Sequence, residues 1–140
     1  MARVTDEIAS NTKAIHQAMP FAKKLGLELV AAGAEEVRCR LEWSDELSGA
    51  GVGMHGGAIM GLADAAGGLC AFLNLPEGAS GTTTIESKTN FLRAVRSGAV
   101  EAVSRPLHTG RSVVVVETDV IDADSRLVAR VTQSQIVLRP

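Results

Sequence analysis

Tyrosine is absent from this chain of 140 residues, which has only one tryptophan and three phenylalanines. Charge of one sign is not in excess either, since 14 basic and 16 acidic residues give a formal net charge of −2. Surfaces that bind nucleic acids combine clustered Lys and Arg with stacking aromatic rings. The composition therefore excludes a nucleic-acid-binding function.

Cysteine and histidine are also scarce. Cys39 and Cys70 do not make a disulfide framework, and no CxxC pair is present. The three histidines, His16, His55 and His108, lie far apart in the sequence. We therefore expect no metal site and no redox cofactor. The N-terminus lacks the apolar core of a signal peptide, so we expect a cytoplasmic protein.

A long hydrophobic run is missing as well. The longest apolar stretch, residues 58–73, is short for a membrane span, rich in glycine, and interrupted by Asp64. This excludes a membrane-spanning function. Asp64 is the only charged residue between His55 and Leu75. A helix that is apolar on all sides is buried, so we expect Asp64 to be a buried carboxylate that is hydrogen-bonded, paired, protonated or used in catalysis.

The spacing around Asp64 predicts two different helix faces. At 3.6 residues per turn, one stripe carries almost no side-chain bulk, and the opposite side is bulky enough to pack on a sheet. The small stripe comprises Gly57, Gly61, Asp64, Gly68 and Ala71, and the bulky side comprises Ile59, Leu62, Ala66, Leu69 and Leu73. Glycines inside a helix cost stability, so their concentration around one acid favours a functional site. The alternative is a small-residue seam against a partner helix, with Asp64 bonded to a backbone amide.

The order of elements predicts one α+β domain spanning residues 1–140. A helix over about residues 4–18 ends at Pro20, and short breaks separate several strands that alternate polar and apolar residues. The expected strands are 25–30, 36–43, 82–92, 98–104, 111–121 and 127–138, and the expected central helix is about 56–74. The short breaks favour an antiparallel meander. One antiparallel sheet wrapped around one buried helix satisfies this pattern, and its open edges favour oligomers.

The residues His55-Gly56-Gly57 precede the central helix directly. The first amides of a helix have no internal partner and carry positive partial charge, so the Gly56 amide can polarise a carbonyl and stabilise an oxyanion. Asp64 follows Gly56 by eight residues, or about 12 Å along a helix axis. This distance is too long for both groups of one chain to act on one atom. We therefore expect the acid and the amide to meet across a dimer interface.

Two segments carry a family resemblance. The run from His55-Gly-Gly to Asp64-Ala-Ala, followed by the Thr-rich segment from Thr83 to Ala94, resembles the hotdog-fold acyl-CoA thioesterases. The branch with phenylacetyl-CoA and 4-hydroxybenzoyl-CoA thioesterases is the most similar. The resemblance covers roughly residues 20–138 and implies a hotdog fold that hydrolyses an acyl-CoA thioester, with an aryl or medium-chain acyl group, to free acid and coenzyme A.

The resemblance also implies a catalytic role for four residues. The Gly56 amide would donate to the thioester carbonyl, and His55 would order that end of the site. Asp64 would be the nucleophile or the general base, a choice that the sequence leaves open. The Thr83 hydroxyl would orient water or Asp64. The implied assembly is a homodimer with sites at its interface, paired into a homotetramer.

Substrate contacts are assigned to a further set of residues. Gly57 allows close approach, and an apolar acyl pocket would be lined by Met54, Met60, Phe91 and Leu92. Arg93 and Arg111 are the candidates for the phosphates of coenzyme A.

One position departs from the family pattern. Many members carry Asn or Gln six residues before the His, where this chain has Gly49. The missing amide could otherwise hold water or the carbonyl. Two alternatives therefore stay open, namely a non-catalytic module that binds acyl-CoA and a hotdog enoyl-CoA hydratase or dehydratase.

Overall fold

The computed structural model describes residues 2–51 and 53–140. Three α-helices, one short 3-10 helix and six strands follow one another along the described chain. Their bounds are α1 Ala2–Ala18, α2 Pro20–Leu25, β1 Glu28–Ala32, β2 Val37–Glu42, η1 Asp45–Leu47, α3 Gly56–Phe72, β3 Gly81–Phe91, β4 Ala99–Thr109, β5 Val113–Ile121 and β6 Leu127–Leu138. The α+β class and the central helix are confirmed.

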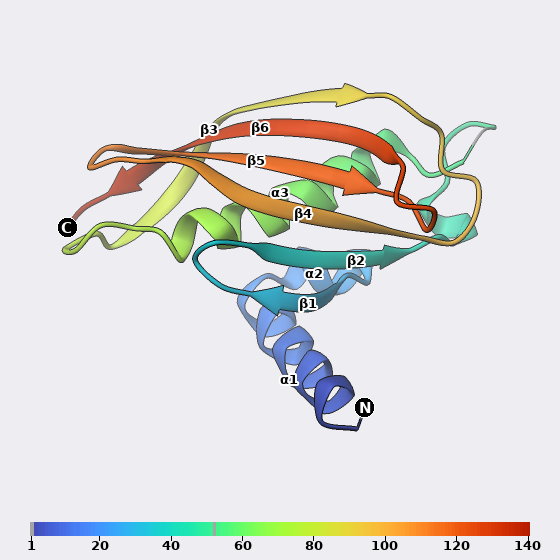
Figure 1. Cartoon of the computed structure of the whole chain (residues 1–140), viewed down its shortest axis with the longest axis horizontal. Helices are drawn as coiled ribbons and strands as arrows, with labels where there is room; N and C mark the ends of the chain where they lie inside the picture. The colour runs from blue at the N-terminus through green and yellow to red at the C-terminus, as the bar shows by residue number, and fades with distance from the viewer. Residues whose placement is uncertain (1, 52) are drawn as a thin grey trace.

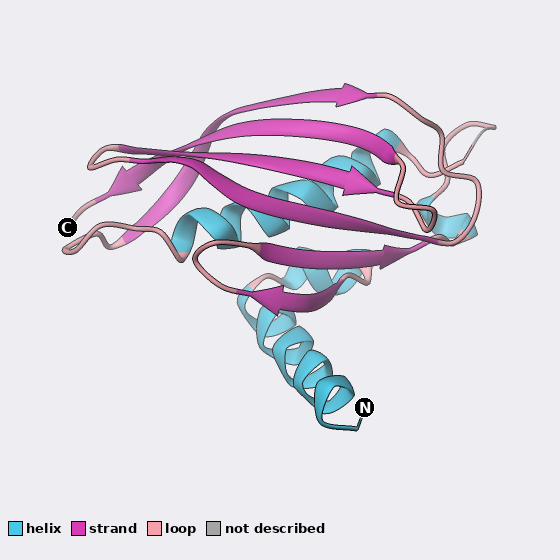
Figure 2. Cartoon of the chain, in the orientation of Figure 1, coloured by secondary structure: helices cyan, strands magenta, loops and turns pink. Residues whose placement is uncertain are grey.

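All six strands form one antiparallel sheet in the order β1-β2-β4-β5-β6-β3. The sheet curves around α3, which lies across one of its faces (Figures 1 and 2). The expected meander is wrong at one step. Strand β3 does not pair with β4, which follows it, but crosses to the far edge and pairs with β6. The connection 92–98 is long enough to pass the end of the sheet, where the Met54 amide donates to the Val95 carbonyl.

The core lies between α3 and the inner face of the sheet. Leu62 and Ala66 on α3 are fully buried, as are the inward-facing valines Val114, Val116 and Val120 of β5. Alternate residues of a strand point to one face, and this pattern of β5 matches the predicted alternation. The bulky side of α3 thus packs on the sheet as expected, although Leu73 at its end is 39% exposed.

The strand expected at residues 25–30 begins later, at Glu28, because Leu25 ends the unpredicted helix α2. Pro20 ends α1 and also begins α2, where its missing N–H and fixed φ suit the first helical position. Gly26 closes α2 in a left-handed conformation with φ of 85°. Phe21 and Leu25 of α2 then contact α3 at Gly61, which has no side chain to block them.

The two edges of the sheet differ. At the β1 edge, the Thr12 hydroxyl of α1 accepts the Leu29 amide at 2.9 Å, and His16 Nε2 donates to the Leu27 carbonyl at 2.7 Å. Helix α1 therefore satisfies backbone groups that an edge strand otherwise leaves unpaired. At the β3 edge no described strand follows, and most β3 side chains are exposed. The β3 edge is thus the open one.

Candidate active site

The loop before α3 is a tight structure held to its surroundings by backbone hydrogen bonds. Ser48 and Met54 form an isolated antiparallel bridge. The His55 amide then donates to the Leu47 carbonyl at 2.7 Å, and the Met54 amide donates to the Val95 carbonyl at 2.6 Å. These bonds fix the first residues of α3 against the 92–98 connection.

Replacing Gly53 by alanine is expected to lower the free energy of unfolding by about 1–3 kcal/mol. Gly53 has φ of +84°, and a Cβ there would overlap the Val95 carbonyl oxygen. Gly51→Ala is the matched control, because Gly51 also has positive φ but faces open space. Urea denaturation of both variants tests this. Equal losses would show that the Val95 contact contributes nothing.

His55 is the N-cap of α3. Its Nδ1 accepts the Gly57 amide at 2.8 Å. Because Nδ1 is the acceptor, the proton of the neutral ring lies on Nε2, which leaves Nε2–H as a donor. His55 therefore orders the N-terminal end of the helix, the place where the resemblance puts it.

The backbone amides in the first turn of α3 differ in whether they have a hydrogen-bond acceptor. The Gly57 amide donates to His55 Nδ1, and the amides of Ala58 and Ile59 both donate to the His55 carbonyl. The Gly56 amide alone among these four has no partner within the described residues. The free donor that the sequence predicts at a helix N-terminus is thus reduced to one N–H group.

A recess of about 370 Å³ lies beside Gly56. The Phe91 ring packs directly on Gly56, since a Cβ at that glycine would lie 3.1 Å from Phe91 Cζ. The recess is lined by Met54, Gly56, Ile59, Phe91, Leu92, Arg93, Ala94 and Val95. The structure therefore brings five of the predicted residues together at one place, namely Met54, Gly56, Phe91, Leu92 and Arg93.

Asp64 is exposed, which corrects the expectation of a buried carboxylate. Its stripe points away from the sheet, with Gly57 exposed and Gly61 and Gly68 partly exposed beside it, while Ala71 is buried. Asp64 makes no hydrogen bond or ion pair with any described residue. Along α3 it lies about 12 Å from Gly56. One chain therefore presents the acid and the amide on one helix, but does not bring them together.

Thr83 lies on the other side of the sheet from Asp64. It pairs with Ile136, which is exposed on the outer face, whereas its neighbour Thr84 pairs with the buried Gln135. Gln135 Nε2 donates to Thr84 Oγ1 at 2.6 Å, so Thr84 faces α3. Within one chain the Thr83 hydroxyl is thus not placed beside Asp64.

The remaining substrate-contact candidates are dispersed. Met60 is 41% exposed on α3, one turn before Asp64. Arg111 lies in the turn between β4 and β5, next to the end of β6, where its carbonyl accepts Arg139 Nη2 at 3.0 Å; the start of β3 is at the same end of the sheet, beyond β6. The length of β3, about 33 Å for ten steps, separates it from Arg93.

Gly49 lies against the predicted site. A Cβ at this position would be 3.6 Å from both Cα and Cδ2 of His55. The departure from the family pattern is therefore located beside the cap of α3. The buried residue Gln133 was missed from the sequence, because a glutamine in an alternating strand is normally expected to face solvent.

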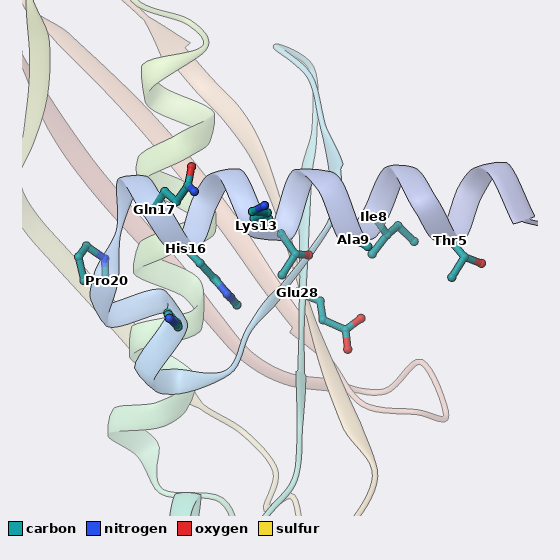
Figure 3. A pocket seen from close by; sticks show the side chains of 10 residues that line it. Thr5, Ile8, Ala9, Lys13, His16, Gln17, Pro20 and Glu28 are labelled. Carbon is teal, nitrogen blue, oxygen red and sulfur yellow. The ribbon is translucent and has the colours of Figure 1, made fainter.

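A second recess, of about 780 Å³, lies between α1, α2 and β1 (Figure 3). It contains none of the predicted site residues. Its lining consists of Thr5, Ile8, Ala9, Thr12, Lys13, His16, Gln17, Pro20, Lys23 and Glu28. No three His, Cys, Asp or Glu side chains within residues 2–51 and 53–140 are grouped as a metal site. None of the helices in the described part of the chain is both long and apolar enough to cross a membrane.

Comparisons with known proteins decide the family. A family model described as the thioesterase superfamily matches residues 53–129, which include His55, Gly56 and Asp64. The chain belongs to the thioesterase superfamily. Its general reaction class is thioester hydrolysis, and the hotdog fold implied by the resemblance is confirmed.

Individual members of the superfamily support this assignment. A Haemophilus influenzae protein classed provisionally as an esterase is 30% identical over 135 residues, covering 95% of this chain and 91% of its own. The crystal structure of the H. influenzae thioesterase HI1161 superposes with a TM-score of 0.77 at 28% identity, covering 82% of this chain and 80% of its own. Escherichia coli 1,4-dihydroxy-2-naphthoyl-CoA hydrolase is 34% identical over 74 residues, covering 53% and 54% of the two chains.

Proposed function

We propose that this thioesterase-superfamily protein hydrolyses acyl-CoA thioesters with an aryl or medium-chain acyl group, at sites formed between two subunits. The observation that carries the proposal is the Gly56 amide, the one N–H of the first turn of α3 without a partner among the described residues, at the edge of the recess lined by Phe91 and Leu92. A coenzyme A ester is also the named substrate of the E. coli relative, a hydrolase.

The chemistry follows from these groups. The thioester carbonyl oxygen accepts the Gly56 N–H, and the positive end of the α3 dipole stabilises the negative charge that develops there. Asp64 either removes a proton from water, which attacks the carbonyl carbon, or attacks it directly and is later released by water. In both cases the C–S bond breaks, the sulfur leaves as the thiol of coenzyme A, and the acyl group leaves as a carboxylic acid. No metal or redox cofactor takes part in the proposed reaction.

A homodimer would bring the Gly56 amide and the Asp64 carboxylate together. Met60, Asp64 and Phe72 of α3 are exposed, and exposed Phe21 of α2 packs at Gly61, so several large apolar side chains are exposed on and beside α3. Such a patch favours burial against a second copy, as does the open β3 edge. Two antiparallel α3 helices would place Gly56 of one subunit near Asp64 of the other. We extend the proposal to a homotetramer of two such dimers.

The same dimer arrangement also has a consequence for how the phosphates of coenzyme A are bound. Arg93 lines the recess at Gly56, whereas Arg111 of the same chain lies at the opposite end of the sheet, the end at which β3 begins. If two β3 strands run antiparallel side by side, Arg111 of the partner subunit approaches Arg93. We therefore propose Arg93 for the phosphates of coenzyme A, joined by the partner's Arg111.

Gly49 favours one second candidate, a module that binds acyl-CoA without hydrolysing it. Position 49 lies against His55 but has no side chain to hold an attacking water. Asp64 argues for hydrolysis, because it is the only acid on the apolar, glycine-rich α3 and a binding module gains nothing from a charge there. The test measures thiol release from a panel of acyl- and aryl-CoA esters. Tight binding by calorimetry without thiol release would establish the binding module instead.

The protein's own thiols are not expected to disturb this assay. Burial raises the pKa of Cys39 to about 12, with a smaller contribution from the charge of Glu101, and burial raises the pKa of Cys70 to about 11. The thiolate is the reactive form, so a raised pKa means slow reaction at neutral pH in the folded state. A colorimetric thiol reagent should detect both cysteines only after denaturation. Rapid labelling of the folded protein at pH 7 would contradict this.

A further inference from the structure

Most of the buried side-chain atoms that lack a hydrogen-bond partner belong to Thr89 and Gln133. Among the described residues, the buried polar side-chain atoms without a partner are Trp43 Nε1, Thr89 Oγ1, and both Nε2 and Oε1 of Gln133. Buried polar groups are nearly always hydrogen-bonded, because an unpaired group has lost its hydration without compensation. Thr89 and Gln133 therefore mark a place that is built to hold a further polar group.

Thr89 and Gln133 are neighbours on adjacent strands. In the β3–β6 pairing, Ser87 is opposite Gln133 and Thr89 is opposite Val131. Directly opposed residues share a face, and Val131 and Gln133 are both buried beneath α3. Thr89 thus lies diagonally next to Gln133 on the helix-facing side, with about 7–8 Å between their Cβ atoms.

The Gln133 amide reaches the underside of α3 at Gly67. A Cβ at Gly67 would overlap Gln133 Oε1, so only glycine allows this approach. Gly67 follows Asp64 by three residues, and such residues are neighbours on a helix surface. The side-chain amide of Gln133 therefore lies about one helical turn from Asp64, which is on the face of α3 that the proposed dimer buries. Three rotatable bonds in the glutamine side chain let it turn toward a group bound between α3 and β3.

A row of β3 side chains leads from this place to Gly56. Ser87, Thr89 and Phe91 alternate onto the helix-facing side, and the Phe91 ring packs on Gly56. Thr89 is two residues from Phe91, or about 7 Å along the strand. Arg93, the proposed phosphate contact, lies on the other side of Phe91 from Thr89 along the chain. An acyl group whose carbonyl accepts the Gly56 amide would therefore extend toward Thr89 and Gln133.

We propose that Thr89 and Gln133 determine specificity for acyl groups that carry a neutral hydrogen-bonding substituent, such as a hydroxyl, at their distal end. This inference rests on the proposed thioester hydrolysis. A hydroxyl both donates and accepts, which matches the Gln133 amide and the Thr89 hydroxyl. Neither side chain is charged, so this pair of side chains suits a neutral substituent rather than a carboxylate or an amine.

The test compares kcat/KM for 6-hydroxyhexanoyl-CoA and hexanoyl-CoA, which share one carbon chain and differ in one distal hydroxyl. The wild-type protein should prefer the hydroxylated ester by at least about tenfold. Gln133→Leu and Thr89→Val should each bring the ratio close to one while thermal melting shows a folded protein. Gln135→Leu is the matched control. Gln135 is also a buried β6 glutamine, but it is already bonded to Thr84, so its loss should leave the ratio unchanged.

Each alternative result has a separate meaning. A ratio that falls in Gln135→Leu as much as in Gln133→Leu would show a general effect of core polarity and overturn the assignment. A wild-type protein that releases thiol from both esters without preference would also overturn it, and would leave the proposed hydrolysis intact. No thiol release from either ester, or from the wider panel, would overturn the proposed hydrolysis and this inference with it.

Discussion

Asp64→Asn should reduce thiol release from the best acyl-CoA ester by about 10²- to 10⁴-fold, the range expected on loss of a general base. Asparagine preserves the size of the side chain but can neither accept a proton from water nor attack the carbonyl effectively. Because Asp64 has no hydrogen bond or ion pair within the described chain, its neutralisation breaks no contact of the fold and should change the free energy of unfolding of the subunit by no more than about 0.5 kcal/mol. Steady-state kinetics and urea denaturation measure the two effects.

Asp119→Asn provides the control for this experiment. Asp119 lies on the outer face of the sheet and forms an ion pair with Arg130 at 2.7 Å. Its neutralisation should leave thiol release unchanged. A folded Asp64→Asn protein with wild-type turnover would remove the central element of the proposed mechanism.

The sequence predicts the positions of the helices and strands because the residue patterns that specify them are local. The 58–73 run predicts α3 to within a few residues, and the alternation in β5 gives the correct inward-facing valines. The order of the strands in the sheet is not specified by local patterns. Strand β3 leaves the meander and pairs with β6, because its partner is chosen by the path of the 92–98 connection around the end of the sheet. Neither the length nor the composition of that connection specifies this path.

Asp64 and Thr83 show why the site is harder to predict than the fold. An apolar helix indicates burial on all sides, yet a single subunit covers only the side that meets the sheet, so Asp64 stays exposed. The face on which Thr83 lies depends on strand register, and β3 carries a bulge between Thr84 and Glu86. A one-residue shift reverses which side chains face the helix. Gly56 was predictable because helix ends always leave unpaired amides.

The first turn of α3 allows the amide to be tested separately from any side chain. Gly56→Pro should lower kcat by about 10²- to 10³-fold, the loss expected when one oxyanion donor is removed. Proline has no N–H, yet it suits the first position of a helix, and the extended backbone of His55 before it (φ −60°, ψ 135°) is compatible with a following proline. Gly56→Ala is the control, because it adds the same Cβ against Phe91 and keeps the N–H.

Steric and electronic effects separate in this pair of variants. If contact with the Phe91 ring were the cause, Gly56→Ala would lose as much activity as Gly56→Pro. If the amide is the donor, Gly56→Ala retains most of its turnover, and any remaining change appears mainly in KM. Equal, near-wild-type turnover in both variants would exclude the Gly56 amide from the reaction.

Co-expression of Asp64→Asn and Gly56→Pro then asks whether the two groups act across the interface. In a mixed dimer, one site combines the intact Gly56 of the first variant with the intact Asp64 of the second, and the other site carries both defects. Random mixing makes half of the dimers mixed, so about a quarter of wild-type activity should return. If both groups acted within one chain, every site would carry a defect and no activity would return. The 12 Å that separates Gly56 from Asp64 along α3 predicts the first result.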